Sequence, residues 1–173
     1  MDNQKSTFIR NEVWALTIAG AFQRSNIYKK EATETQREVF KKELRASVDK
    51  LVKAYEAKAI KPEIHLQNIE SVVQFFKKYD FINNEYSRFG IAQKVLNLYL
   101  KYLWVLNLVK VPPHFPVDRQ IQYLLKIKES DIEPWTTMKE SRKYMDIINL
   151  AQTKLEPIDN NCIASLELRL FNK

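Results

Sequence analysis

A helix that must be largely buried carries a row of polar side chains. Residues 90–104 read GIAQKVLNLYLKYLW, in which leucine, valine and tyrosine predominate. Steps of four, three, four and three residues place one set on a single helical face: Gly90, Lys94, Asn97, Lys101 and Trp104. A buried amine costs several kcal/mol to desolvate unless it is paired or used in chemistry. We therefore expect this row to line a cleft or to form buried pairs, unless Lys94 extends to solvent and Asn97 bonds a backbone carbonyl.

A carboxylate follows a rigid turn 24 residues after Lys94. The segment KVPPHFPVD contains three prolines, which restrict the backbone and remove amide donors, so it is predicted to be non-helical. Asp118 comes directly after this turn, where a carboxylate caps the next helix and is stabilised by the helix dipole. One helix of about five or six turns and the returning chain can bring Asp118 into one cleft with Lys94.

The elements that must position these residues are predicted to be helices. The chain has 173 residues, with only 2 glycines and 6 prolines, and 45% of it is hydrophobic, a balance typical of an all-α globular protein. We expect one compact domain over residues 1–173, with two lobes that meet near residues 86–120, and no strand. Apolar residues at three- and four-residue steps predict about seven helices. Five lie near residues 5–22, 34–57, 62–80, 91–109 and 117–128, a sixth carries the apolar residues of 144–151, and a short final one carries those of 163–170.

Specific core and cap residues follow from the same patterns. The third helix is expected to bury Ile64 and Tyr79 on its apolar face. Thr137 and Glu140 would form a capping box before the sixth helix. One of the residues 159–161 would cap the last helix, because Asp and Asn are preferred there.

The chain is basic. Its 28 Lys and Arg residues outnumber its 21 Asp and Glu residues, which gives a formal net charge of +7 and a pI of about 9.4. This balance favours an anionic partner, with nucleic acid first, although basic residues also serve solubility alone. A basic face on and before the second helix would contact phosphates or would simply be solvated: Lys29, Lys30, Lys41, Lys42, Arg45 and Lys53.

Cysteine and histidine are too few for a metal centre. Cys162 is the only cysteine, which excludes a disulfide framework, a cysteine-ligated zinc site and a four-cysteine iron–sulfur cluster. His65 and His114 alone do not make a metal site, so no metal and no cofactor are expected. The sequence has no basic segment followed by an apolar stretch at its start and no run of about 18 apolar residues. We expect no membrane partner and a cytoplasmic protein, or a nuclear one in a eukaryote.

Residues 86–125 resemble the helix–hairpin–helix DNA glycosylases, the endonuclease III-like superfamily of base-excision repair enzymes. The signature of that family is a glycine-containing hairpin, a lysine that begins a long apolar helix, and a PVDTH turn whose aspartate faces the lysine. Here GIAQKVLN is similar to the hairpin-to-helix stretch, with Lys94 in the lysine position, and FPVDRQI is similar to the aspartate turn, with Asp118. The match is partial, because Ala92 stands where a second glycine is usual and RQ stands where TH is frequent. The iron–sulfur cysteines of the family are absent, as they are in many of its members.

The resemblance implies a two-lobed helical fold and a DNA glycosylase with abasic-site lyase activity. A lysine desolvated in an apolar cleft has a lowered pKa and can attack C1′ of a flipped nucleotide as a neutral amine, forming a Schiff base that permits strand cleavage. Lys94 would take this role. Asp118 would activate the nucleophile or stabilise the developing oxocarbenium charge. The partner would be duplex DNA that contains a damaged base or an abasic site.

Further residues of the same stretch would bind the DNA or shape the cleft: Gly90, Gln93, Asn97, Lys101, Trp104, His114 and Arg119. Asn97 and Lys101 would orient Asp118 or contact phosphate. A flipped base would need an aromatic surface, although aromatic residues at helical spacing more often pack a core: Trp104, Tyr99, Tyr102, Phe115 and Trp135 are available. His114 is either a polar contact at the cleft mouth or a turn residue, and His65 is expected to form a hydrogen bond inside the core.

Two other functions fit the same residues. A non-catalytic nucleic-acid- or protein-binding module would use Lys94 and Asp118 as a buried salt bridge that holds the central helix to the proline turn. An interaction protein would instead present an exposed aromatic patch around Trp135 and the final helix. These alternatives differ in measurable ways, because phosphate contacts make DNA affinity fall steeply with salt.

Overall fold

The chain folds into helices joined by short connections. The computed structural model describes residues 3–83 and 88–172. Seven α-helices lie in these ranges: α1 (Asn3–Phe22), α2 (Glu34–Ala57), α3 (Pro62–Phe76), α4 (Arg88–Val105), α5 (Arg119–Leu124), α6 (Ser141–Gln152) and α7 (Ile163–Phe171). The same ranges contain two short 3₁₀ turns, Glu129–Asp131 and Pro157–Asp159, and an isolated antiparallel bridge between Tyr28 and Ile82, but no strand. The prediction of an all-α protein with seven helices is confirmed.

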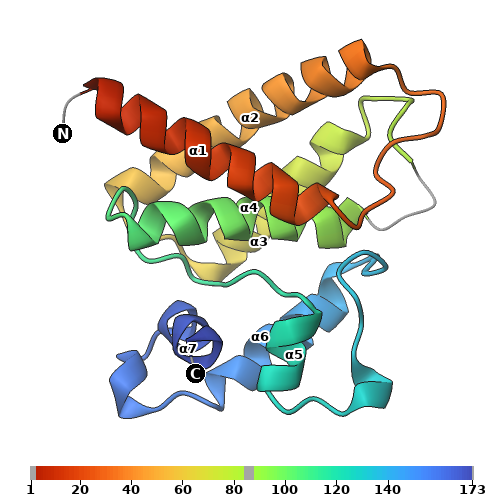
Figure 1. The fold of residues 1–173 in the computed structure, drawn as a ribbon. Coiled ribbons are helices and arrows are strands. Elements are labelled where there is room, and N and C mark those ends of the chain that lie inside the picture. The colour runs from red at the N-terminus through yellow and green to blue at the C-terminus, as the bar shows by residue number, and fades with distance from the viewer. Residues whose placement is uncertain (1–2, 84–87, 173) are drawn as a thin grey trace.

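The helices form two groups, one above the other (Figure 1). In the upper group α4 packs against α1 and α3, and α2 packs against α3. In the lower group α7 contacts both α5 and α6. We call α1 to α4 the N-terminal half, and residues 110–172, with the proline-rich turn, α5 to α7 and the segments between them, the C-terminal half. One connected cluster of buried side chains runs through both halves, so they share a core.

The start of α2 is set by its first turn. The Thr33 side chain accepts a hydrogen bond from the Gln36 backbone amide at 3.2 Å, and the Gln36 side chain accepts one from the Thr33 amide at 2.8 Å. This reciprocal capping box satisfies two amides that a helix start leaves unpaired. Further along the helix, Phe40, Leu44 and Tyr55 are completely buried, as the spacing predicts.

The apolar face of α3 differs from the prediction at its start. Ile64 is 44% exposed, whereas the neighbouring His65 is completely buried. His65 has hydrogen-bond partners on both ring nitrogens, so burying it leaves no polar group unpaired, and the helical period then turns Ile64 outward. The helix ends at Phe76, and Tyr79 packs against the core from the turn that follows.

The central helix α4 begins earlier and ends earlier than expected. It starts at Arg88, so that Gly90 lies inside its first turn, and it ends at Val105, two residues before Asn107 takes a left-handed conformation with φ 57°. Most of its 18 residues are buried. The predicted loop before Gly90 falls partly on residues 84–87, which lie outside the described residues.

Two predicted helix caps are wrong. The Thr137 hydroxyl donates to the Pro134 carbonyl at 3.0 Å, and Glu140 makes no side-chain capping bond at the start of α6, so the capping box is absent. α7 is capped by Cys162, whose sulfur accepts from the Ser165 amide at 3.4 Å. The expected cap residues 159–161 come too early, because the chain makes a 3₁₀ turn there and begins the helix only afterwards.

α5 is also shorter than the predicted range 117–128. It contains six residues, and the chain turns out of it where Lys126 adopts a positive φ of 64°. Its start is as expected, because Asp118 is the N-cap and its Oδ1 accepts from the Ile121 amide at 3.0 Å.

Candidate functional site

The polar row of α4 faces the C-terminal half. Gly90, at the start of the row, donates its amide to the Met138 carbonyl at 3.0 Å. A Cβ atom at this position would lie 1.7 Å from the Trp135 carbonyl oxygen, so only glycine allows the two backbones to approach this closely. Here the Gly90 amide binds a carbonyl of the chain itself.

Gln93 fixes the proline turn to α4. Its side chain is completely buried, and its Nε2 donates to the Val117 carbonyl at 2.7 Å while its Oε1 accepts from the Val117 amide at 3.1 Å. Both backbone groups of Val117 are thereby satisfied inside the protein. The neighbouring Asp118 is consequently held at a defined position relative to α4.

Lys94 and Asp118 form a direct ion pair. Lys94 Nζ lies 2.5 Å from Asp118 Oδ2, and the two side chains are 10% and 20% exposed. The other carboxylate oxygen caps α5 through Ile121, so both oxygens of Asp118 have a partner. Lys94 Nζ also lies 5.7 Å from the centre of the Trp135 ring. The expected approach of residues 94 and 118 is therefore observed, and the alternative in which Lys94 extends freely to solvent is wrong.

Asn97 is the junction of a buried hydrogen-bond chain between the halves. Its Nδ2 donates to Gln93 Oε1 at 3.2 Å and to the Tyr144 hydroxyl at 3.0 Å. Its Oδ1 lies 2.8 Å from His65 Nε2, and His65 Nδ1 lies 2.7 Å from the Tyr55 hydroxyl. All of these side chains are buried. Asn97 thus bonds other side chains rather than Asp118 or a backbone carbonyl.

The direction of every bond in this chain follows from one backbone amide. Because the Val117 amide must donate, Gln93 Oε1 is an acceptor and Asn97 presents its NH₂ group to it. The Asn97 oxygen is then an acceptor, so His65 carries its proton on Nε2 and accepts from the Tyr55 hydroxyl on Nδ1. In this arrangement His65 is neutral, and each of these hydrogen bonds has one donor and one acceptor.

The hydrogen-bond chain continues into the C-terminal half, where it reaches a second histidine, His114. Tyr144 accepts from Asn97 and contacts His114 Nδ1 at 3.0 Å, so its hydroxyl donates to that nitrogen. His114 is 1% exposed, and its ring packs edge-on against His65, with centroids 4.8 Å apart. Burial lowers the pKa of His65 to about 3, with a smaller contribution from His114, and lowers the pKa of His114 to about 4. The expectation that His65 is bonded in the core is confirmed.

A second ion pair lies two turns along the same row. Lys101 Nζ lies 2.6 Å from Glu167 Oε1 on α7 and 4.6 Å from the centre of the Phe171 ring. Glu167 is only 2% exposed, and burial raises the pKa of its carboxyl, while Lys101 acts in the opposite direction. Lys94 and Asp118 also act on the Glu167 carboxyl electrostatically, so the four charges form one group. Lys101 therefore bonds Glu167 and not the expected Asp118.

The remaining predicted site residues are spread around this group. Trp104 is half-buried at the end of the row, and Arg119 is exposed beside Asp118, with its guanidinium 5.9 Å from the Tyr123 ring centre. Trp135 is only 7% exposed, so the alternative of an exposed aromatic patch around it is wrong. The structure buries Trp135 because its backbone packs on Gly90 and its ring lies beside Lys94. Of the other aromatic residues considered for base stacking, Tyr99 and Phe115 are buried, and Tyr102 is half-buried.

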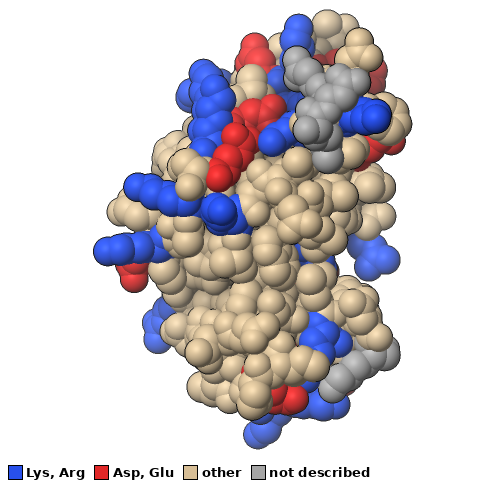
Figure 2. All heavy atoms as spheres, turned by 90° about the vertical axis from the view of Figure 1, so that its left-hand side faces the viewer, with Lys and Arg blue, Asp and Glu red and all other residues tan. Residues whose placement is uncertain are grey.

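Three of the six basic residues of α2 form ion pairs with acidic neighbours, and Arg37 with Glu34 is one of these pairs. Lys41 binds Glu38 at 2.7 Å, and Arg45 lies 3.6 Å from Asp49. On the face drawn in Figure 2, basic and acidic side chains lie side by side in the upper part, and uncharged surface occupies most of the middle. This mixture weakens the local field that a phosphate backbone would meet.

Comparison with known proteins identifies no relative of this chain. No protein-family model, no curated protein and no solved structure matches the chain. Among the residues that the structure describes, His, Cys, Asp and Glu side chains nowhere gather in a group of three that could hold a metal ion. In the same part of the chain, no helix has the length and apolar character needed to cross a membrane.

Sequence reasoning missed three members of the site. Glu167 and Tyr144 lie 66 and 47 residues from the α4 side chains that they bond, Lys101 and Asn97. Tyr55 completes the hydrogen-bond chain through His65 on α3. Glu167 had one available signal, since it is the single acidic residue within the apolar stretch IASLELRLF. The tyrosines had no such signal, because their spacing is that of ordinary core residues.

Proposed function

We propose that this chain is a DNA-binding protein of the glycosylase type, in which Lys94 is the nucleophile and Asp118 is its proton acceptor. The observation that carries the proposal is the direct contact of these two side chains, 2.5 Å apart, at positions brought together from 24 residues apart. Asn97 in the polar row and the adjoining Gln93 are completely buried, whereas Lys94 and Asp118 keep 10% and 20% of their side-chain surface exposed. The proposal requires that a nucleotide turned out of the duplex reach this partly exposed pair.

The chemistry follows from the ion pair. Asp118 takes a proton from the Lys94 ammonium and leaves a neutral amine, whose lone pair attacks C1′ of the flipped nucleotide. The bond from C1′ to the base breaks, and its electrons leave with the base, which is then protonated. Loss of a proton from nitrogen and opening of the sugar ring give the Schiff base. Removal of a proton from C2′ then forms the C2′–C3′ double bond and expels the 3′ phosphate. The apolar surroundings and the nearby Trp135 ring keep bulk water away from the amine.

Borohydride trapping tests this proposal directly. Borohydride reduces a Schiff base to a stable amine, so the wild-type protein with duplex DNA containing an abasic site is expected to yield a covalent protein–DNA adduct. Lys94→Gln is expected to abolish the adduct. Lys101→Gln is the matched control, because Lys101 lies on the same face of α4 and also forms an ion pair with a carboxylate. Absence of an adduct from wild type, or equal loss in both variants, would refute the role of Lys94.

A different observation favours a second function. Five residues of α4 bond or pack against the C-terminal half, and all of them belong to the polar row or adjoin it: Gly90, Gln93, Lys94, Asn97 and Lys101. In this second reading the chain is a non-catalytic binding module, and the Lys94–Asp118 pair simply joins the two halves. Removing one partner of a largely buried pair leaves a charge without compensation, at a cost of about 1–3 kcal/mol where the pair is partly exposed.

The two functions give different combinations of results. A binding module yields no borohydride adduct, and its melting temperature falls on Lys94→Gln. It binds duplex DNA with a binding constant whose logarithm falls linearly with the logarithm of salt concentration. A protein that neither forms the adduct nor binds DNA in a salt-dependent way is outside both proposals. Differential scanning calorimetry and fluorescence anisotropy at three salt concentrations supply these measurements.

A further inference from the structure

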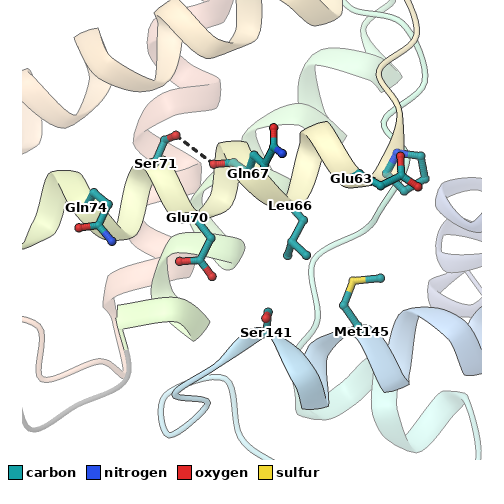
Figure 3. A pocket seen from close by; sticks show the side chains of 9 residues that line it. Glu63, Leu66, Gln67, Glu70, Ser71, Gln74, Ser141 and Met145 are labelled. Carbon is teal, nitrogen blue, oxygen red and sulfur yellow. Dashed lines mark hydrogen bonds between the residues drawn. The ribbon is translucent and has the colours of Figure 1, made fainter.

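A groove separate from the charged group lies between α3 and α6. It has a volume of about 590 Å³, within the range of pockets that hold small organic ligands. Figure 3 shows Leu66 and Glu70 pointing from α3 toward α6, and Ser141 and Met145 on the opposite side. The lining comes from both halves of the protein: Pro62, Glu63, Leu66, Gln67, Glu70, Ser71, Gln74, Ser141 and Met145.

The middle of this groove is apolar. Leu66 on α3 and Met145 on α6 are both partly buried and pack against the core, so each presents the remainder of its side chain to the groove. A methionine adapts its shape to a flexible aliphatic ligand, because it is unbranched and polarizable. The Ser71 hydroxyl at the side of the groove already donates to the Gln67 carbonyl at 2.9 Å, so its proton is not available to a ligand.

The charge of the groove is opposite to that of the protein. Among the described residues that line it, Glu63 and Glu70 are the only ionisable ones and none is Lys or Arg, although the chain as a whole carries a net charge of +7. Within the described residues neither carboxylate takes part in a salt bridge. Glu63 lies in the first turn of α3, where the helix dipole stabilises it, but Glu70 lies mid-helix and has no such role.

The spacing of the two carboxylates defines the shape of a matching ligand. Seven residues separate them on α3, which is about 10 Å along the helix axis, and Leu66 lies between them. A cation at either end can therefore be paired while an aliphatic body covers Leu66 and Met145. An anionic ligand of the same length would meet two uncompensated carboxylates.

We propose that the groove between α3 and α6 binds an amphipathic organic cation, an aliphatic amine whose chain packs on Leu66 and Met145 and whose ammonium group pairs with Glu63 or Glu70. Because α3 and α6 belong to different halves, such a ligand bridges them and stabilises the folded protein by mass action. This groove does not include Lys94 or Asp118, so the proposal is independent of the proposed DNA chemistry.

Methyl NMR of the full chain labelled with ¹³C-methyl methionine tests the proposal. The probes are octylammonium and octanoate, which share one chain length and differ in the sign of their charge. Octylammonium is expected to shift the Met145 signal in a saturable way, and to bind at least about tenfold more tightly than octanoate. Met138, which is completely buried elsewhere, is the internal control and should not move. The Met145 signal is assigned with Met145→Leu.

Charge-neutral variants separate pairing from simple apolar contact. Glu63→Gln combined with Glu70→Gln should weaken octylammonium binding about five- to tenfold and leave octanoate binding equal or stronger. Glu31 is an exposed carboxylate outside the groove. Glu31→Gln removes one charge from the same protein and should change neither octylammonium binding nor octanoate binding. Equal affinity for the two probes, or no effect of the double variant, would overturn the proposal. A Met145 shift produced by raising the protein concentration without any probe would assign the groove to a second copy of the chain and would also overturn it.

Discussion

The buried histidine pair makes the stability of this protein depend steeply on mild acid. His65 and His114 are neutral in the folded state, with pKa values of about 3 and about 4, and both return to an ordinary value near 6.5 when the chain unfolds. Below pH 6.5 the unfolded chain therefore binds two protons that the folded protein does not. Each contributes a slope of about 1.4 kcal/mol per pH unit, so the free energy of unfolding should fall by about 4 kcal/mol between pH 7.5 and pH 5.

Urea unfolding followed by circular dichroism, at intervals of half a pH unit, measures this slope. Other groups titrate in the same range, and Glu167 acts in the opposite direction, because its raised pKa makes the folded state bind protons more readily as the pH falls. The comparison of wild type with His114→Gln cancels those contributions. The variant should be less stable at pH 7.5, but its loss of stability between pH 7.5 and pH 5 should be about 2 kcal/mol smaller than that of wild type. Equal slopes in the two proteins would refute the assignment of a neutral, buried His114.

Three further predictions concern the junction between the halves. Gly90→Ala should lower the free energy of unfolding by about 3 kcal/mol or more, because the added Cβ would lie 1.7 Å from a backbone oxygen. Gly20→Ala is the control and should be nearly neutral in the same thermal unfolding, since its Cβ meets only the flexible end of Leu98 at 2.8 Å. Lys101→Met should destabilise the protein more than Glu167→Gln, because it leaves the Glu167 carboxylate buried without its partner. Calorimetry should show a smaller difference in stability between the two variants at pH 5 than at pH 7.5, because the carboxyl takes up a proton as the pH falls. Asn97→Ala should cost about 3 kcal/mol in urea unfolding, and a loss below about 1 kcal/mol would contradict its position as the junction of the buried chain.

The helical class of the protein could be read from its sequence because that property is local. Few glycines, apolar residues at three- and four-residue steps and a proline-rich break each act over one or two helical turns. The same local patterns placed the polar row on one face of α4 and placed Asp118 at a helix start. Errors of the same kind arose at the third helix, where an apolar pattern could not show that a histidine with two buried partners would replace Ile64 in the core.

The sequence by itself determined that Lys94, Asn97 and Lys101 share a face and that a buried charge among them needs a partner. Only the tertiary structure decided which partner each one has: Asp118 for Lys94, His65 and Tyr144 for Asn97, and Glu167 for Lys101. The physical reason is that a hydrogen bond or an ion pair depends on separations of about 3 Å, while spacing along a helix fixes only direction. The partners lie between 24 and 66 residues away in the chain, and the packing of α3, α6, α7 and the start of α5 around α4 brings them within that distance.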